Sequence, residues 1–130
     1  MSATPSPDIE ATKEHCHPED VRPVRLEAAG LESTAPEYLR DLKRELASDG
    51  LYPAGLEVEV RFDEDCTLAT QDEADRLRSY VRAAAFLGVG RVTVRVEEVA
   101  DESKVEPALA ACAERARREG VLLDVERSTD

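Results

Sequence analysis

The sequence predicts an α/β fold in which four mainly parallel strands alternate with three helices, in the order βαβαβαβ. Two observations support this prediction. Segments in which every second residue is apolar alternate with segments in which apolar residues recur every three or four positions. Each helical segment also follows a capping motif and ends at a glycine. Such alternation is typical of a parallel sheet with right-handed crossover connections.

The first strand is predicted at residues 24–28, and a helix follows it. Thr34 and Glu37 have the spacing of a capping box, which places the start of this helix at the threonine. Pro53 and Gly55 come after the helix and indicate an extended loop, because both residue types interrupt regular structure.

The second strand, at residues 56–63, has the clearest alternation of apolar and charged residues. A second capping box, Thr70 with Glu73, predicts the start of the longest helix. Gly88 marks the end of that helix.

The third strand is predicted at residues 92–97 and the last at residues 121–126. Between them, Ser103 and Glu106 form a third capping box. Gly120 ends the helix that this motif begins.

The strands predict that the helices cover only one face of the sheet. Strands buried on both faces read as continuous apolar runs, whereas these four alternate apolar with polar residues. One face is therefore apolar and the other polar. If each crossover steps in the same direction, the sheet curves like half of a (β/α) barrel.

Composition divides the chain into a disordered tail at residues 1–22 and a single α/β domain at residues 23–127. The tail has three prolines and few large apolar residues, so it cannot bury enough surface to offset the entropy of ordering. We find no signal peptide and no apolar segment of membrane-spanning length. These absences favour a cytoplasmic protein.

The charge limits the classes of partner. With 29 acidic and 17 basic residues, the net charge is −12. This excess argues against nucleic acids and anionic membrane surfaces, which bind basic faces. It is also what we expect of a halophilic protein, because concentrated salt screens repulsion between carboxylates. The alternative is an ordinary acidic protein from a GC-rich genome.

Residues 77–126 resemble the middle of the xylose-isomerase-like sugar phosphate isomerase/epimerase TIM barrels. Three segments carry the resemblance: a helix that ends in AAFLG at residues 84–88, the AERA motif at residues 113–116, and a final strand that ends at Glu126. The resemblance implies a barrel that binds a divalent metal, with Glu126 as a ligand. The chain departs from that family in having four predicted strands instead of eight. An uncharacterised haloarchaeal family with similar local patterns is the alternative.

Carboxylates follow the predicted strands at the edge of the sheet where parallel α/β folds bind ligands. Glu97 and Asp63 are, with Glu126, candidate ligands for Mg, Mn or Zn, and Glu27 and Asp65 are further candidates. The competing interpretation is a solvated acidic rim. It is favoured because carboxylates are common throughout the chain.

The cysteines and histidines offer two weaker candidates. Cys66 follows a strand and precedes a helix, where a thiolate could be activated, but we expect a small buried loop cysteine instead. His15, Cys16 and His17 form a short tract with ligand types that suit zinc, nickel or copper. A redox or metal sensor that combines Cys66 with this tract is a third hypothesis.

The favoured function is a small non-catalytic interaction or ligand-binding module, with a homodimer or another protein as partner. The alternative is a metal-dependent isomerase or epimerase half-barrel acting on a small, sugar-like substrate. The sequence contains no Walker loop, GxGxxG, GxSxG or HExxH motif, so it gives no support for several common enzyme classes. Whether the chain is an enzyme stays open, with the balance against it.

Overall fold

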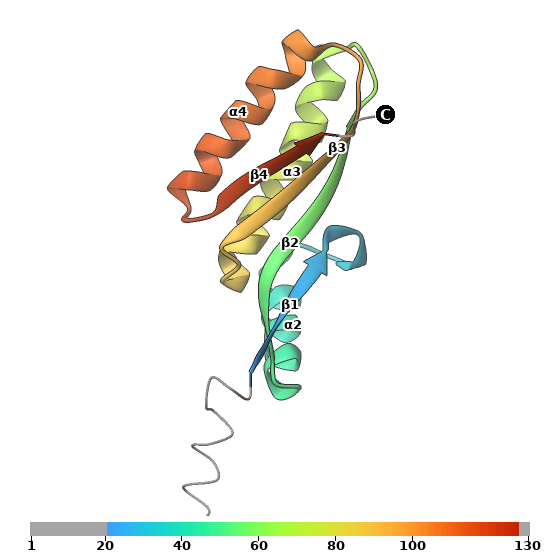
Figure 1. Cartoon of the computed structure of the whole chain (residues 1–130). Coiled ribbons are helices and arrows are strands. Elements are labelled where there is room, and N and C mark those ends of the chain that lie inside the picture. Colours follow the sequence, from blue (N-terminus) through green and yellow to red (C-terminus); the bar gives the residue numbers. More distant parts are fainter. Residues whose placement is uncertain (1–20, 128–130) are drawn as a thin grey trace, which may run out of the picture.

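A computed structural model describes residues 21–127. These residues form, in order, β1 (Arg22–Glu27), the short 3-10 helix η2 (Ala28–Gly30), α2 (Pro36–Ser48), β2 (Leu51–Phe62), α3 (Thr67–Leu87), β3 (Arg91–Val99), α4 (Glu102–Arg118) and β4 (Leu122–Arg127). The predicted alternation of four strands with three α-helices is confirmed (Figure 1).

The four strands form one sheet in the order β1-β2-β3-β4, and every neighbouring pair is parallel. Glu27, Glu57, Thr93 and Asp124 lie side by side in one row across all four strands. The three α-helices pack on one face of the sheet (Figure 1). The domain therefore has the architecture of half a TIM barrel, as predicted.

The core lies between the sheet and the helices. Val58 and Val60 on β2 and Val94 on β3 are buried, while their neighbours along the strands are polar or charged and face away. From the helix side, Leu77 and Val81 of α3 are completely buried against them. The apolar residues at every second position of the strands and those at helical spacing in α3 thus pack together in one apolar layer.

The strand β2 begins five residues earlier than predicted, at Leu51. Pro53 and Gly55, which indicated a loop, lie inside it and pair with β1. The ladder between β1 and β2 has a register shift between Val24 and Arg25, next to Pro53. A shift of this kind is where a strand tolerates proline, because the hydrogen-bond ladder is already interrupted.

The first two capping boxes are wrong. α2 begins at Pro36 after Ala35, and no side chain caps it. α3 begins at Thr67, so Thr70 lies within its first turns and is buried. Proline at the first helical position and tertiary burial determine these starts, whereas the hydroxyl spacing does not.

The third capping box is displaced. α4 is capped by Asp101, whose carboxylate accepts hydrogen bonds from the backbone N–H of Ser103 at 3.0 Å and from its hydroxyl at 2.6 Å. Aspartate precedes the serine and reaches the same exposed amide of the first turn, so it takes the capping position.

Among the helices of residues 21–127, none has both the length and the hydropathy needed to cross a membrane.

Candidate functional site

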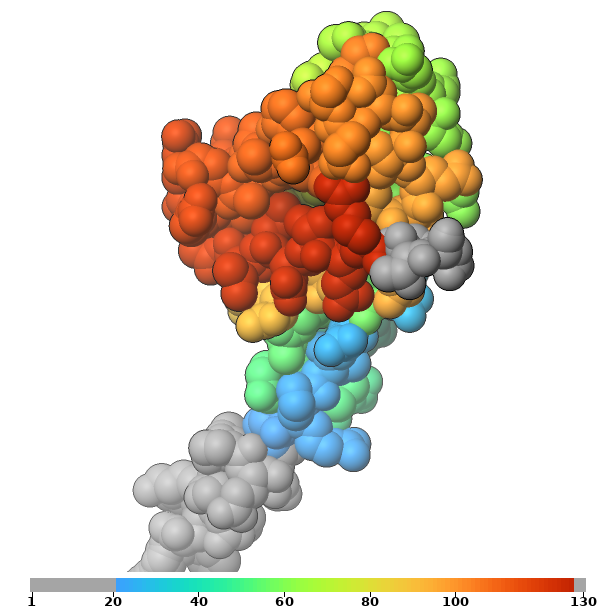
Figure 2. All heavy atoms as spheres, turned by 45° about the horizontal axis from the view of Figure 1, so that its top comes forward, coloured from blue at the N-terminus to red at the C-terminus, as the bar shows by residue number. Residues whose placement is uncertain are grey.

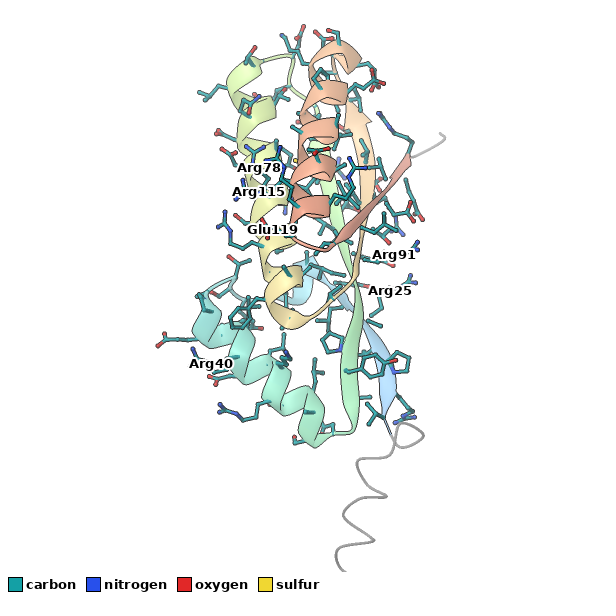
Figure 3. All side chains as sticks on the ribbon, turned by 90° about the vertical axis from the view of Figure 1, so that its left-hand side faces the viewer. Arg25, Arg40, Arg78, Arg91, Arg115 and Glu119 are labelled. Carbon is teal, nitrogen blue, oxygen red and sulfur yellow. The ribbon has the colours of Figure 1, made fainter. Side chains whose placement is uncertain are left out.

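The open face of the sheet, defined here as the face opposite the helices, carries charged side chains from all four strands. Figure 3 shows Arg25 and Arg91 projecting on this side of the sheet. The Arg25 guanidinium donates to the Glu57 carboxylate at 2.7 Å, and Arg95 lies 3.7 Å from the same carboxylate. Glu57 on β2 is therefore held between cations from β1 and β3.

Two further ion pairs join neighbouring strands. Arg91 on β3 pairs with Asp124 on β4 at 3.0 Å, and Arg61 on β2 pairs with Glu98 on β3 at 3.1 Å. Their side chains are about half exposed, so each pair contributes at most about 1 kcal/mol. The pairs compensate part of the acidic charge of the open face, which remains polar and accessible to another molecule.

A shallow hollow of about 150 Å³ lies at the centre of the open face. Its charged lining comes from Glu27, Glu57, Glu59 and Arg95, and Thr93 adds a hydroxyl. Three carboxylates against one guanidinium favour a cationic or hydroxyl-bearing group over an anion. The hollow is open to solvent on the side away from the helices.

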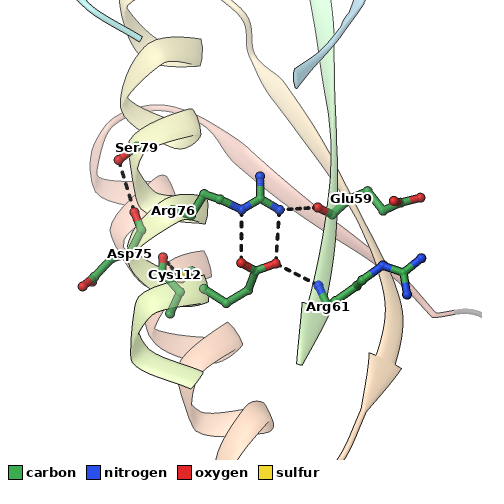
Figure 4. Close-up of polar contacts among 8 residues, drawn as sticks. Glu59, Arg61, Asp75, Arg76, Ser79 and Cys112 are labelled. Carbon is green, nitrogen blue, oxygen red and sulfur yellow. Dashed lines mark hydrogen bonds and ion pairs between the residues drawn. The ribbon is translucent and has the colours of Figure 1, made fainter. Parts of the chain in front are cut away.

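Two side chains of α3 bind the edge of β2 beyond the point where β1 ends. β1 ends opposite Glu57, but β2 continues to Phe62. There α3 supplies the missing hydrogen bonds: Glu73 accepts from the backbone N–H of Arg61 at 2.8 Å, and Arg76 donates to the carbonyl of Glu59 at 2.6 Å (Figure 4). Two side chains thus take the place of a neighbouring strand.

Glu73 and Arg76 also pair with each other at 3.1 Å, and we call these two residues the edge clamp. Burial raises the pKa of Glu73, but hydrogen bonds from the Arg76 side chain and the Arg61 backbone outweigh it, so the net pKa is lowered. The hydrogen bond to Glu73 raises the pKa of Arg76. Both groups are therefore charged at neutral pH, where they pair with each other and bind the β2 backbone.

The candidate metal ligands lie at the carboxyl ends of neighbouring strands. Asp63 directly follows β2, Glu97 lies at a register shift in β3, and Glu126 lies in β4 opposite Arg95. Within residues 21–127, however, no three or more His, Cys, Asp and Glu side chains gather as a group able to hold a metal ion. The residues described do not fit a resident metal centre.

Asp65, in the loop before α3, contacts the first turn of α4. Its carboxylate accepts from the Lys104 ammonium at 2.6 Å, and Asp101 lies 3.8 Å from the same ammonium. The hydrogen bond to Asp65 raises the pKa of Lys104. This contact ties the start of α3 to the start of α4, and gives Asp65 a structural partner.

Cys66 is exposed at the residue that precedes α3, so the expectation of a buried loop cysteine is wrong. The helix starts here, earlier than the capping box indicated, and the residue at its N-cap faces solvent. Cys112, by contrast, is buried, and burial raises the pKa of its thiol. The tract at residues 15–17 lies outside the described residues.

Sequence reasoning missed the edge clamp. The signal was present, because a glutamate and an arginine three residues apart face each other on a helix. The spacing of Thr70 and Glu73 instead predicts a capping box. Nothing in the sequence indicates that β2 extends beyond the end of β1.

Two solved structures are similar to the chain. One is a xylose isomerase domain protein from Planctomyces limnophilus, with a TM-score of 0.64 and 10% identity over 94% of this chain and 48% of that one. The other is the IolI protein with a zinc atom, with a TM-score of 0.54 and 19% identity over 92% of this chain and 45% of that one. The chain spans about half the length of each, and the similarity at these identities concerns the fold.

The resemblance to xylose-isomerase-like barrels is therefore confirmed at the level of the fold. No curated protein matches the sequence significantly. A family model matches residues 20–125, which include almost all of the four strands and three helices. The chain belongs to the family described as Domain of unknown function (DUF8564).

Proposed function

We propose that this domain is a non-catalytic binding module of the cytoplasm, and that its open face and edge strands are covered by a second copy of the chain. One observation carries the proposal. The sheet of residues 21–127 is a four-stranded half-barrel with helices on one face only, so β1 and β4 each have one edge that pairs with no described strand. Free parallel edges favour pairing with another chain.

The surface of β4 supports this proposal. Leu122 is 53% exposed and Val125 is 37% exposed, although both are large apolar residues in a strand. Figure 2 shows the atoms of β4 (red) at the surface of the molecule. Pairing along this edge would remove their apolar surface from water, which stabilises an assembly.

The acidic charge supports a setting of concentrated salt. At molar salt the Debye length is about 3 Å, so the net charge of −12 no longer opposes the approach of two copies. The proposed environment is therefore the cytoplasm of a halophile.

The molar mass in solution tests the proposal. We expect light scattering of the 130-residue chain in concentrated KCl to give twice the mass of 14.3 kDa, and a lower average mass in dilute buffer, where acidic chains repel. Circular dichroism under both conditions serves as the control for folding. A monomeric mass at every protein concentration in concentrated KCl would contradict the proposed function.

A second candidate is a metal-dependent activity on a small, sugar-like substrate. The similarity to a xylose isomerase domain protein and to a zinc-carrying protein favours it. The described residues weigh against it, because they form no group of metal ligands. We therefore rank it below the binding module and derive no reaction step from it.

Metal analysis separates the two candidates. We expect protein purified in concentrated KCl without chelator to contain far less than one divalent ion per chain. The Glu126→Gln variant, which removes one carboxylate charge, should give the same content. Near-stoichiometric Mg, Mn or Zn in the wild type that is lost in Glu126→Gln would reverse the ranking.

A further inference from the structure

We propose that two copies close a twofold eight-stranded barrel, in which β4 of each copy pairs in parallel with β1 of the other and Glu126 faces Arg25 across each junction. This inference rests on the proposed function, because it names the edges and the register by which the second copy binds. It also identifies an ion pair that the single chain cannot form.

The register follows from rows of aligned residues. The row through Glu27, Glu57, Thr93 and Asp124 crosses the sheet from one edge to the other. In a (β/α) barrel the strands tilt, so that a row followed once around the barrel returns about eight residues nearer the N-terminus of its first strand. A half-barrel accounts for about four of these residues.

Counting back about four residues from Glu27 places Asp124 opposite Pro23 of the second copy. Two residues further along each strand, Glu126 is then opposite Arg25. This register pairs all six residues of β4 with residues 21–26, which include nearly all of β1. A shift in the opposite direction would leave β4 facing residues beyond the end of β1.

The chemistry of the two edges agrees with this register. Glu126 is exposed and forms no ion pair with any residue in the described part of the chain, and the Arg25 side chain is 69% exposed although it contacts Glu57. Both lie on the open face. On the helix side, the same register brings the exposed Val125 opposite the half-buried Val24. The register therefore places opposite charges together on the open face and apolar residues together on the helix side.

Other arrangements put like charges together. A register shifted by two residues toward the C-terminus of β1 sets Glu126 against Glu27 of the second copy. Antiparallel pairing of two β4 edges brings the carboxylates of Asp124 and Glu126 from both copies onto one junction. Barrel closure avoids both of these like-charge contacts. It encloses the two open faces in the barrel interior, where ion pairs between strands, such as Arg25–Glu57 and Arg91–Asp124, compensate part of their charge.

A disulfide cross-link tests the register. Cys16 and Cys66 are first replaced by serine, and Arg25→Cys and Glu126→Cys are combined in that chain. Within one copy these positions lie on opposite edges of the sheet, three strand spacings or about 14 Å apart, too far for a disulfide. We expect mild oxidation to give a covalent dimer in high yield, which reducing agent dissociates.

The matched controls are the two chains that carry only one of the two introduced cysteines; the buried Cys112 is kept in all of them. Each should remain monomeric on a denaturing gel after oxidation, because closure keeps like positions apart. Mixing the two control chains should restore the cross-link. A cross-link in Glu126→Cys alone would show β4 edges pairing with each other, and would overturn the inference.

A charge reversal provides a second measurement that needs no oxidation. Glu126→Arg should weaken dimerisation by roughly tenfold or more, because it sets two cations against each other in each junction. Glu45→Arg, on the exposed surface of α2, makes the same change in net charge and should not weaken the dimer. Equal dissociation constants for the two variants would contradict the register.

The outcomes separate the two proposals. A dimeric mass without the cross-link or the charge effect would leave the proposed function standing and overturn the inference. A monomeric mass in concentrated KCl would overturn both.

Discussion

Replacing Leu77 with alanine is expected to lower the free energy of unfolding by about 2–5 kcal/mol. Leu77 lies in the middle of α3 and is completely buried between that helix and the sheet. The substitution removes the apolar contact and leaves a cavity that closely packed neighbours fill only in part. For a small domain this is a large share of a total stability of about 5–15 kcal/mol.

The matched control is Leu68→Ala in the same helix. Leu68 is 70% exposed, so the same change of side chain should alter stability by less than about 0.5 kcal/mol. Chemical denaturation followed by circular dichroism measures both variants. Similar losses in the two would mean that α3 does not pack against the sheet through its Leu77 face.

Removing the charge of the edge clamp is the second substitution with a large expected effect. Glu73→Gln should cost about 1–3 kcal/mol at pH 7, because it weakens charge-assisted hydrogen bonds to Arg76 and to the backbone N–H of Arg61. Glu73 is partly buried, with its side chain 19% exposed, so water replaces these bonds only in part. Asp72→Asn, at the exposed preceding position of α3, is the matched control and should have little effect.

The effect of Glu73→Gln should depend on pH in a defined direction. The pKa of Glu73 is lower in the folded chain than its ordinary value of about 4.3. Its charge therefore stabilises the fold above that value, and the contribution is lost as the pH falls through the folded pKa. The difference in unfolding free energy between wild type and variant should be constant near neutral pH and shrink in acid.

Measuring both proteins in one buffer series isolates this residue, because other carboxylates titrate equally in the two. A difference that persists unchanged into acid would show that the clamp acts through shape instead of charge.

The sequence by itself determined the type and order of every strand and α-helix. Strict alternation in residues 56–62 and the helical spacing of Leu77 and Val81 are local signals, because the pattern of burial follows directly from backbone geometry. The same alternation indicated one apolar and one polar face, and hence the half-barrel. The exposed polar face was therefore predictable as the candidate site.

Local patterns failed where distant residues decide the outcome. Pro53 reads as a loop residue, yet it lies inside β2 because a register shift in the paired strand accommodates it. Glu73 reads as a cap, yet it replaces a missing strand, because β1 ends before β2 does. In both cases the local propensity is small compared with the free energy of pairing and packing.

The candidate site shows the same division. The sequence indicated that Glu57, Arg95 and Glu126 share one face, since residue parity fixes the face on which a side chain lies. It did not indicate that Arg25 and Arg95 hold Glu57 from either side, nor that Glu126 lacks a partner among the described residues. Those facts depend on the alignment of neighbouring strands. Alignment is determined by contacts between residues far apart in the chain, which only the tertiary structure brings together.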